Sequence, residues 1–295
     1  MIPFPSNFQS DRFLIKTPAS GVMLDLSKNV YIMGILNLSP DSFYVGYSDP
    51  KHALDAAERM IQEGADILDI GGQSTRPGAD EIPIDEEIKR IKIIKEIRRL
   101  FPNVVISVDT YRSEVANVAF DLGADILNDI SAFRFDPNIK KVCQNYKAPA
   151  ILMHTTAKPK LMQEKCIQDD NKVMDIIKAY LMESVAESDS MGIKSIIDPG
   201  IGFGKKPHQN LIIINRIEEL VQTGYPVLLG ASRKSFIGYS LNPSDPLPPS
   251  ERLEGTIAVS VIALLKGVRI LRVHDVKENV RALKVCAAVV SSTLS

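Results

Sequence analysis

Eight short apolar segments, each followed by a segment in which apolar residues recur at helical spacing, constrain the fold of this chain most strongly. The apolar segments are residues 30–36, 66–70, 104–108, 125–127, 149–153, 194–197, 226–229 and 269–273. The helical segments are residues 51–62, 84–100, 113–121, 137–146, 170–191, 208–222, 251–265 and 276–290. Because the predicted strands are apolar on both faces and alternate with helices, we expect them to pair in parallel. Eight such units predict an α/β fold, the closed (β/α)8 TIM barrel.

The same repeat indicates how the chain is divided. Gly-Ala-Asp-Ile-Leu occurs at residues 64–68 and again at 123–127, each time where a helix should end and a strand begin. Residues 13–16 and 22–25 predict a β-hairpin ahead of the barrel. The Pro- and Ser-rich stretch 240–250 is expected to be a loop after the seventh strand rather than a linker. We therefore expect residues 1–295 to form a single barrel domain, with residues 1–28 as an N-terminal hairpin extension.

Composition excludes several classes of protein. The net charge of −1 and the pI of about 6.5 provide no global field for nucleic acid or an acidic membrane. No apolar run reaches the length of a membrane span, and the N-terminus does not resemble a secretory signal. The three cysteines are odd in number and lack metal-ligand spacing, which is typical of a reducing compartment. We therefore expect a cytoplasmic protein without a nucleic acid or membrane partner.

Polar residues follow the ends of the predicted strands. They are Asn37, the stretch 71–76, Asp109, Asn128, His154, Asp198, the stretch 232–234, and Arg272 with His274. Any one of them alone is most often a helix cap or a hydrogen-bonded structural residue. In barrels of this type, the C-terminal ends of the strands meet at one mouth, which carries the active site. Their recurrence at eight strand ends therefore predicts a polar pocket at that mouth.

The end of the sixth predicted strand can likewise be structural or ligand-binding. Asp198 follows the apolar segment 195–197, and glycines occupy positions 200, 202 and 204 before a helical pattern begins near His208. Alone, this stretch fits an ordinary turn with a capping aspartate. Beside the other strand ends, it fits a carboxylate presented to a ligand, with Gly202 and Gly204 allowing that ligand close to the backbone.

The polar residues form two chemical groups. Hydrogen-bond acceptors and an amide suited to a flat heterocycle with several N–H donors are expected at Asp109, Asn128 and Asp198. Cations suited to a phosphate or a carboxylate are expected at Arg76, Lys234, Arg272 and His274. The sequence has no Cys/His metal cluster, no Gly-x-Ser-x-Gly motif and no Walker lysine. The carbonyl-type oxygen of Asn37, with waters and substrate phosphates, would suffice for Mg²⁺. Together these groups predict an aromatic heterocycle that carries an anion as the ligand.

Eight ordered motifs resemble those of the dihydropteroate synthases, and the likeness runs from about residue 30 to the C-terminus. They are MGILNLSPDSF at 33–43, GGQSTRPGA at 71–79, SVDT at 107–110, NDI at 128–130, LMH at 152–154, DPGIGFGK at 198–205, SRKSF at 232–236 and RVHD at 272–275. The resemblance implies an enzyme of folate biosynthesis. Such an enzyme condenses 6-hydroxymethyl-7,8-dihydropterin pyrophosphate with 4-aminobenzoate to 7,8-dihydropteroate and pyrophosphate, with Mg²⁺ as cofactor. It also implies a homodimer.

The resemblance further implies a role for each site residue. The pterin would be held by Asp109, Asn128, Met153, Asp198, Gly204 and Lys234. The pyrophosphate would be bound by Arg272 and His274, with Asn37 as the ligand of Mg²⁺ on that anion and Arg272 also stacking on the ring. The aminobenzoate site would be shaped by Thr75, Arg76, Pro77, Phe203 and Ser232. Candidate catalytic residues are Asn37, Lys234, Arg272 and His274. Segments 38–49 and 73–80 would close over the site as lids.

Two departures from the family pattern fall in the predicted lids. Val45 replaces the second aspartate of the first loop, and Gln73 replaces the glutamate of the second. Since neither belongs to the predicted pterin floor, we expect pterin binding to be intact. They motivate one alternative, a non-catalytic pterin-binding paralogue. A second alternative, the pterin-binding domain of a corrinoid methyltransferase, is disfavoured because it needs no pyrophosphate site.

Overall fold

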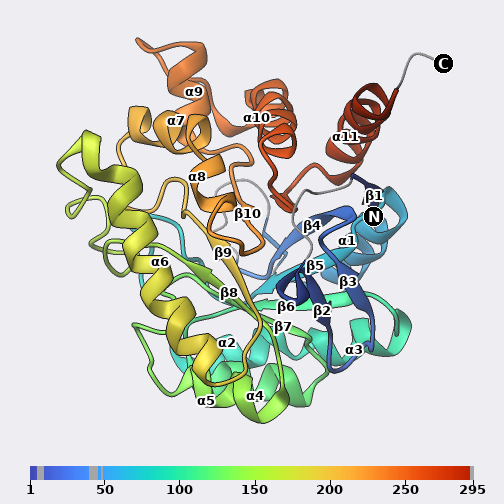
Figure 1. Cartoon of the computed structure of the whole chain (residues 1–295). Coiled ribbons are helices and arrows are strands. Elements are labelled where there is room, and N and C mark those ends of the chain that lie inside the picture. Colours follow the sequence, from blue (N-terminus) through green and yellow to red (C-terminus); the bar gives the residue numbers. More distant parts are fainter. Residues whose placement is uncertain (5–9, 40–45, 48, 293–295) are drawn as a thin grey trace.

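The structure is a computed structural model that describes residues 1–4, 10–39, 46–47 and 49–292, so Val45 lies outside the described residues. Its centre is a sheet of parallel strands (Figure 1). The strands are β4 (Asn29–Asn37), β5 (Ile67–Gly71), β6 (Val105–Asp109), β7 (Ile126–Asp129), β8 (Ala150–Met153), β9 (Ser195–Asp198), β10 (Leu228–Leu229) and β11 (Ile270–Val273). They follow the order β10-β11-β4-β5-β6-β7-β8-β9, and a parallel bridge between Ile197 and Val227 links the two ends of that order. The predicted (β/α)8 barrel is therefore confirmed as a nearly closed barrel.

Helices surround this sheet, and most lie where the apolar periodicity of the sequence predicts them. Those that match a predicted segment are α1 (Pro50–Glu63), α4 (Ser113–Asp121), α5 (Ile139–Tyr146), α6 (Val173–Ser190), α10 (Leu253–Leu265) and α11 (Val276–Ser291). The predicted helix 84–100 is divided into α2 (Ile84–Ile91) and α3 (Ile93–Leu100), because the ψ of −21° at Lys92 tightens the turn towards 3₁₀ geometry. The predicted helix 208–222 is divided into α7 (Pro207–Asn215) and α8 (Glu218–Val221), since Arg216 leaves the helical region with ψ of 16°.

Four elements of the described chain were not predicted. One is the short 3₁₀ helix Asp11–Phe13 ahead of the hairpin. Strand β1 (Ile2–Pro3) pairs antiparallel with β4. Helix α9 (Ser235–Leu241) lies between the seventh strand and its helix and overlaps the start of the segment expected to be a loop. The 3₁₀ turn Pro249–Glu251 ends that segment. The connection after β10 is therefore partly helical.

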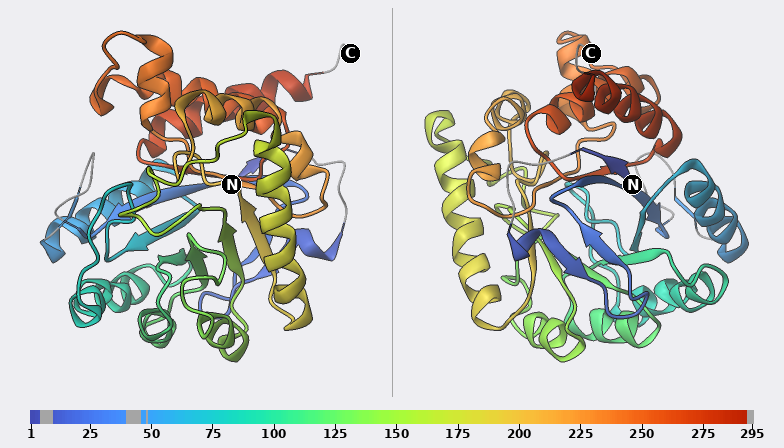
Figure 2. Two further views of the ribbon diagram at one scale, coloured as in Figure 1. Left: turned by 90° about the vertical axis from the view of Figure 1, so that its left-hand side faces the viewer. Right: turned by 45° about the vertical axis from the view of Figure 1, so that its right-hand side comes forward.

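The N-terminal hairpin fills one end of the barrel. It consists of β2 (Leu14–Lys16) and β3 (Met23–Asp25), as predicted, and Figure 2 shows it in dark blue across that end. Its side chains Phe13, Ile15, Leu24 and Leu26 are buried in one cluster with apolar residues from every barrel strand. The strand residues are Tyr31, Met33, Ile67, Val105, Ile126, Ile151, Ile196, Leu228 and Ile270. Because each large apolar side chain stabilises by about 1.5–3 kcal/mol when buried, the hairpin holds the barrel together at this end.

The repeated Gly-Ala-Asp-Ile-Leu sequence has a local cause. Gly64 and Gly123 end their helices with φ of 104° and 102°, a conformation that glycine adopts without strain. The aspartates two residues later, Asp66 and Asp125, each accept a hydrogen bond from a backbone N–H of the preceding barrel strand. The repeat therefore ends a helix and fixes the next strand against its neighbour. Within the described part of the chain, no helix has the length and apolar character needed to cross a bilayer.

Candidate functional site

A cavity of about 550 Å³ lies at the C-terminal ends of the barrel strands, opposite the hairpin. Most of the residues proposed from the sequence line it, and they come from segments far apart in the chain. These lining residues are Asn37, Thr75, Arg76, Pro77, Asp109, Phe203, Ser232, Lys234, Arg272 and His274. The structure therefore brings together residues that are up to 237 positions apart in the sequence, between Asn37 and His274.

Other predicted site residues are buried close behind the lining. Asn128 and Asp198 are about 5% exposed or less, and Asn128 donates to Asp69 at 3.1 Å. Asp198 Oδ1 accepts from the backbone N–H of Gly200 at 2.7 Å. Met153 packs with Tyr111 and Ile130, and Phe203 contacts the same apolar cluster. These side chains form the floor and one wall beneath the cavity.

A buried charge cluster lies in that floor. Arg272 on β11 donates through Nε to Asp69 Oδ2 at 2.6 Å and through Nη2 to Asp109 Oδ2 at 2.8 Å. Asp69 is fully buried on β5, where an unpaired carboxylate would be costly. Arg272 therefore holds two carboxylates from neighbouring strands around one guanidinium.

Asp69 belongs to this cluster although the sequence analysis does not single it out, because it lies inside a strand rather than at its end. The available signal was a charged residue inside an otherwise apolar strand, at position 69 of the segment 67–70. A strand buried on both faces tolerates such a residue only when a partner is present. Its partners here are Arg272 and Asn128.

The floor retains unused hydrogen-bond acceptors. Among the described residues, Asp69 Oδ1 and Asp109 Oδ1 are buried without a hydrogen-bond partner. Buried polar atoms are nearly always paired, so an exception indicates a place where a ligand can supply the donor. Asp109 lines the cavity, and its free oxygen can accept an N–H from a bound ring.

Burial also changes the protonation of the floor. It raises the pKa of Asp109 to about 7, against the opposing effect of the Arg272 charge, and it raises the pKa of Asp198. Burial lowers the pKa of Lys234 to about 7, while Asp198 acts in the opposite direction. Burial also disfavours the charged Arg272, but the attraction of Asp69 and Asp109 leaves its pKa above the usual value. Arg272 is therefore the permanent cation of the floor.

His274 differs from its predicted role as a cation. Burial, together with Arg272, Arg233 and Lys234, lowers the pKa of His274 to about 3. Its ring is therefore neutral near pH 7, and Nδ1 lies 3.0 Å from Ser232 Oγ. His274 lines the cavity, as predicted, but as a neutral hydrogen-bonding group.

The glycine-rich loop after β9 packs against the end of β8. A Cβ at Gly200 would lie 2.0 Å from the carbonyl oxygen of His154, and one at Gly204 would lie 1.7 Å from Thr156 Oγ1. Lys205 Nζ contacts His154 Nδ1 at 2.8 Å and donates to two backbone carbonyls nearby. These glycines are therefore required by contacts within the protein, whereas a close approach of Gly204 to a ligand stays a prediction. His154 is buried in this contact and does not line the cavity. The expectation that it lies at the mouth is therefore wrong, and its contacts are structural.

The turn after β10 is fixed by ionic contacts that leave Lys234 at the cavity. Arg233 adopts φ of 55° and forms a two-point ion pair with Asp275. Lys234 Nζ donates to the carbonyl of Ile201 and lies 4.6 Å from the centroid of the Phe203 ring. The two-point geometry restrains the turn, which aims Lys234 across the floor towards the glycine-rich loop.

Comparisons with known proteins agree with this geometry. A family model described as pterin binding enzyme matches residues 33–274. The dihydropteroate synthase of Clostridium beijerinckii is 42% identical over 275 residues, which cover 90% of this chain and 96% of that protein. The crystal structure of Yersinia pestis dihydropteroate synthase with a sulfonamide drug complex matches with a TM-score of 0.88 and 37% identity, over 95% of this chain and 100% of that chain. A dihydropteroate synthase from Coxiella burnetii in complex with pteroic acid matches with a TM-score of 0.84 and 36% identity, over 95% and 99% of the two chains.

Proposed function

This chain belongs to the pterin-binding enzyme family and, within it, to the dihydropteroate synthases of folate biosynthesis, and we propose how its cavity divides that reaction among its residues. The transferase condenses 6-hydroxymethyl-7,8-dihydropterin pyrophosphate with 4-aminobenzoate and releases pyrophosphate. The observation that carries the assignment of roles is the floor, where an unused oxygen of Asp109 lies beside the permanent cation Arg272.

The floor binds the pterin. Asp109 and Asp198 accept the N–H groups of the pyrimidine edge, and Asn128 adds an amide held in place by Asp69. Lys234 donates to the ring carbonyl, and Met153 packs beside the ring within its apolar cluster. The Coxiella burnetii relative was solved with pteroic acid, a molecule that contains this ring.

The pyrophosphate lies on the β4, β10 and β11 side of the cavity. Arg272 supplies charge there, and the neutral His274 and Ser232 supply hydrogen bonds. Asn37 at the end of β4 is the proposed protein ligand of Mg²⁺, which would neutralise charge on the leaving pyrophosphate. No group of three or more His, Cys, Asp or Glu residues that could hold a metal occurs within the described ranges. A single amide oxygen still fits Mg²⁺, because this ion keeps several waters and binds substrate phosphates.

The part of the cavity nearer its mouth binds 4-aminobenzoate. Arg76 can pair with its carboxylate, while Thr75, Pro77 and Phe203 enclose the benzene ring together with Ser232. Arg76 and Pro77 are exposed at the mouth, and Phe203 is half-buried deeper in the cavity. The acceptor substrate therefore lies between the mouth and the pterin floor.

The chemistry follows from this placement. The aromatic amine of 4-aminobenzoate forms a C–N bond with the pterin methylene carbon, the C–O bond to pyrophosphate breaks, and the amine loses one proton. The electron-rich ring stabilises positive charge at the methylene, and the carboxylates of the floor stabilise the ring when they are ionised. Arg272 stabilises the negative charge of the leaving group. The enclosed floor keeps water from the methylene carbon.

A pyrophosphate-release assay tests the proposed function. We expect release that requires dihydropterin pyrophosphate, 4-aminobenzoate and Mg²⁺ together, with dihydropteroate formed in equal amount. Omission of each component in turn is the control. Tight pterin binding by calorimetry without pyrophosphate release would instead identify the non-catalytic paralogue.

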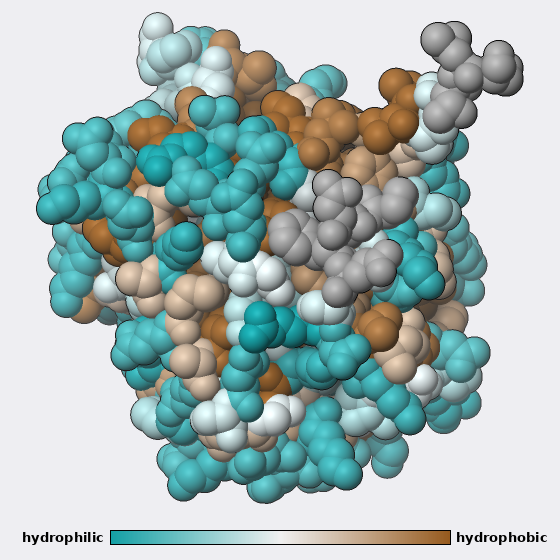
Figure 3. Space-filling model, in the orientation of Figure 1, coloured by the Kyte–Doolittle hydropathy of each residue, from teal (hydrophilic) through white to brown (hydrophobic). Residues whose placement is uncertain are grey.

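We also propose that the protein forms a homodimer through α10 and α11. These neighbouring helices expose Ile262, Leu265, Val285, Val289 and Val290. Figure 3 shows apolar residues gathered over this part of the surface. Contiguous exposed apolar patches mark association surfaces, and a second copy of this chain presents the same self-complementary apolar face about a twofold axis.

A further inference from the structure

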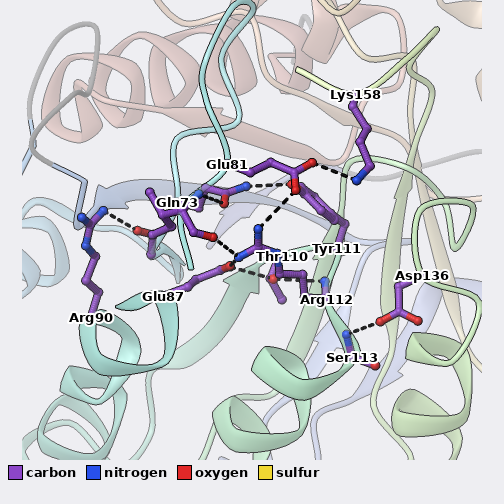
Figure 4. A network of polar contacts seen from close by, with 12 residues as sticks. Gln73, Glu81, Glu87, Arg90, Thr110, Tyr111, Arg112, Ser113, Asp136 and Lys158 are labelled. Carbon is purple, nitrogen blue, oxygen red and sulfur yellow. Dashed lines mark hydrogen bonds and ion pairs between the residues drawn. The ribbon is translucent and has the colours of Figure 1, made fainter. Parts of the chain in front are cut away.

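The loop that carries Thr75, Arg76 and Pro77 is closed at its base by one side chain. Gln73 precedes this loop and Ile82 follows it, and Gln73 Oε1 accepts a hydrogen bond from the backbone N–H of Ile82 at 3.0 Å. Figure 4 shows Gln73 in the surrounding network of polar contacts. The segment between them, residues 74–81, is called the acceptor-side loop below.

Gln73 also attaches the acceptor-side loop to the barrel. Its Nε2 donates to Tyr111 Oη at 2.9 Å, and both side chains are about 5% exposed or less. Because the N–H of Ile82 requires the amide oxygen, the NH₂ group must face Tyr111. One amide therefore both closes the base of the loop and joins it to the residue that follows β6 and Thr110.

Tyr111 extends this connection to the pterin floor. Its ring packs with Ile130 and Met153, and it meets Phe135 edge to face with centroids 5.4 Å apart. Met153 is the apolar residue proposed to lie beside the pterin. The hydroxyl of Tyr111 thus holds the acceptor-side loop while its ring packs within the wall of the pterin site.

At the other end of the loop, Arg112 Nη1 donates to the carbonyl of Ile82 at 2.8 Å, and two further contacts are exposed ion pairs. Glu81 pairs with Lys158 at 2.8 Å and Asp80 pairs with Lys160 at 2.7 Å, and all four side chains reach solvent. Exposed ion pairs hold a loop weakly. The buried contact between Gln73 and Tyr111 therefore restrains the loop more strongly than these ion pairs do, and it joins the base of the loop to the apolar cluster of Met153.

We propose that Gln73 and Tyr111 are a positioning pair that fixes the acceptor-side loop relative to the pterin floor and thereby sets the affinity for 4-aminobenzoate. The role deepens the proposed function and rests on it. Neither residue lines the cavity, so they act through Thr75, Arg76 and Pro77 and are not catalytic residues. The glutamate found at this position in the family pattern can serve the same purpose, since a carboxylate can accept from both Tyr111 O–H and Ile82 N–H.

Steady-state kinetics on four variants test the pair. Tyr111→Phe removes the contact between the two side chains and should raise KM for 4-aminobenzoate about five- to tenfold, the equivalent of one buried hydrogen bond. Gln73→Leu also removes the bond from Ile82 N–H and should raise this KM at least as much. The KM for the pterin substrate and kcat should change far less. The double variant should resemble Gln73→Leu, because that substitution already removes the Gln73 partner of the Tyr111 hydroxyl. Gln73→Glu should restore the parent KM for 4-aminobenzoate.

Tyr146→Phe is the matched control. It removes another tyrosine hydroxyl, one that bonds Asp121 between α4 and α5, away from the cavity. Its KM values should equal those of the parent protein. Additive effects in the double variant, an equal rise in KM for both substrates, or failure of Gln73→Glu to restore affinity would each overturn the proposal.

Hydrogen exchange separates this proposal from the proposed function, since it requires no turnover. Amides in residues 74–82 should exchange faster in Tyr111→Phe and Gln73→Leu than in Gln73→Glu and Tyr146→Phe, while the barrel strands remain protected in all four. Unchanged exchange in an active enzyme would refute the pair. Faster exchange in a protein whose parent form releases no pyrophosphate would support the loop contact and refute the proposed function.

Discussion

Arg272 Nη2 lies 2.8 Å from Asp109 Oδ2, and this ion pair crosses the cavity floor from β11 to β6. The same guanidinium holds Asp69 on β5, which leaves one oxygen of each carboxylate without a partner among the described residues. The floor is therefore already ordered by its own charges and still has acceptors to offer a ligand. Preorganised charge of this kind does not have to rearrange during the reaction.

Asp198→Asn tests the pterin floor. The substitution keeps the shape of the side chain but removes the charge that strengthens its hydrogen bond to the ring, so the Kd for 6-hydroxymethylpterin should rise about 10- to 100-fold. Isothermal titration calorimetry measures this change, and circular dichroism should show an unaltered fold. Asp55→Asn, on the exposed face of α1, is the control. An unchanged Kd in Asp198→Asn would contradict the proposed role.

Asp69→Asn tests the charge cluster behind the floor. Loss of this buried carboxylate leaves Arg272 with one ionic partner instead of two, and we expect the free energy of unfolding to fall by about 3 kcal/mol. Urea denaturation measures the change. Asp80→Asn breaks the exposed pair with Lys160 and should leave stability unchanged. Equal stability of the two variants would show that Asp69 contributes little.

Lys234 should make stability depend on pH in the alkaline range. Its pKa is about 7 in the folded protein, against 10.5 for a lysine in water, so between these values the unfolded chain binds the proton and the folded protein does not. The cost of burying this lysine is absent above pH 10.5 and grows as the pH falls to 7. Urea denaturation from pH 7 to 9.5 should show stability rising with pH, and a smaller rise in Lys234→Met. Identical slopes in the two proteins would refute this effect.

Gly204→Ala tests the packing of the glycine-rich loop. Gly192 is its matched control, because Gly192 has φ of 72° but no atom within 4 Å of an added Cβ, whereas Gly204 has φ of 66° and a Cβ there would lie 1.7 Å from Thr156. Gly192→Ala should cost about 1–2 kcal/mol from left-handed strain. Gly204→Ala should cost about 2 kcal/mol more, because neighbouring atoms must move. Thermal unfolding measures the stability of both variants. Equal losses of stability would mean that the loop accommodates the added methyl group without a steric cost.

The proposed dimer is tested by charge on α11. Val285 and Val289 are 65% and 67% exposed, so Val285→Lys with Val289→Lys should leave the fold intact while placing four lysines at a twofold interface. Sedimentation velocity should show a dimer for the parent protein and a monomer for the double variant. Retained binding of 6-hydroxymethylpterin confirms that the barrel is intact. A dimer that persists in the double variant would place the interface elsewhere.

The barrel could be predicted because its signals are local. Each apolar strand and each helical period is readable within one segment, and the glycine and aspartate of the repeated sequence mark where helix gives way to strand. Helix α9 was missed because Ser235–Leu241 is only seven residues long, contains Gly238 and packs against Arg252 and neighbouring elements. For so short a helix, tertiary contacts outweigh local propensity.

The chemistry of the site was less accessible from sequence. Residues at the strand ends could be placed at one mouth because the topology brings them there. The neutral state of His274 depends on its burial beside three cations, which no single segment reveals. The role of Gln73 likewise depends on Ile82 and Tyr111, which meet it only in the folded protein.

Within the part of the chain that the structure describes, the hairpin fills the barrel at the end opposite the cavity, where Ile15 and Leu24 are buried in one apolar cluster with the strands. We therefore expect both substrates to arrive, and both products to depart, at the mouth between the strand-end loops. A pterin bound at the proposed floor would lie deepest along this path. We therefore expect the pterin substrate to enter before 4-aminobenzoate, and dihydropteroate to leave before another pterin can reach the floor.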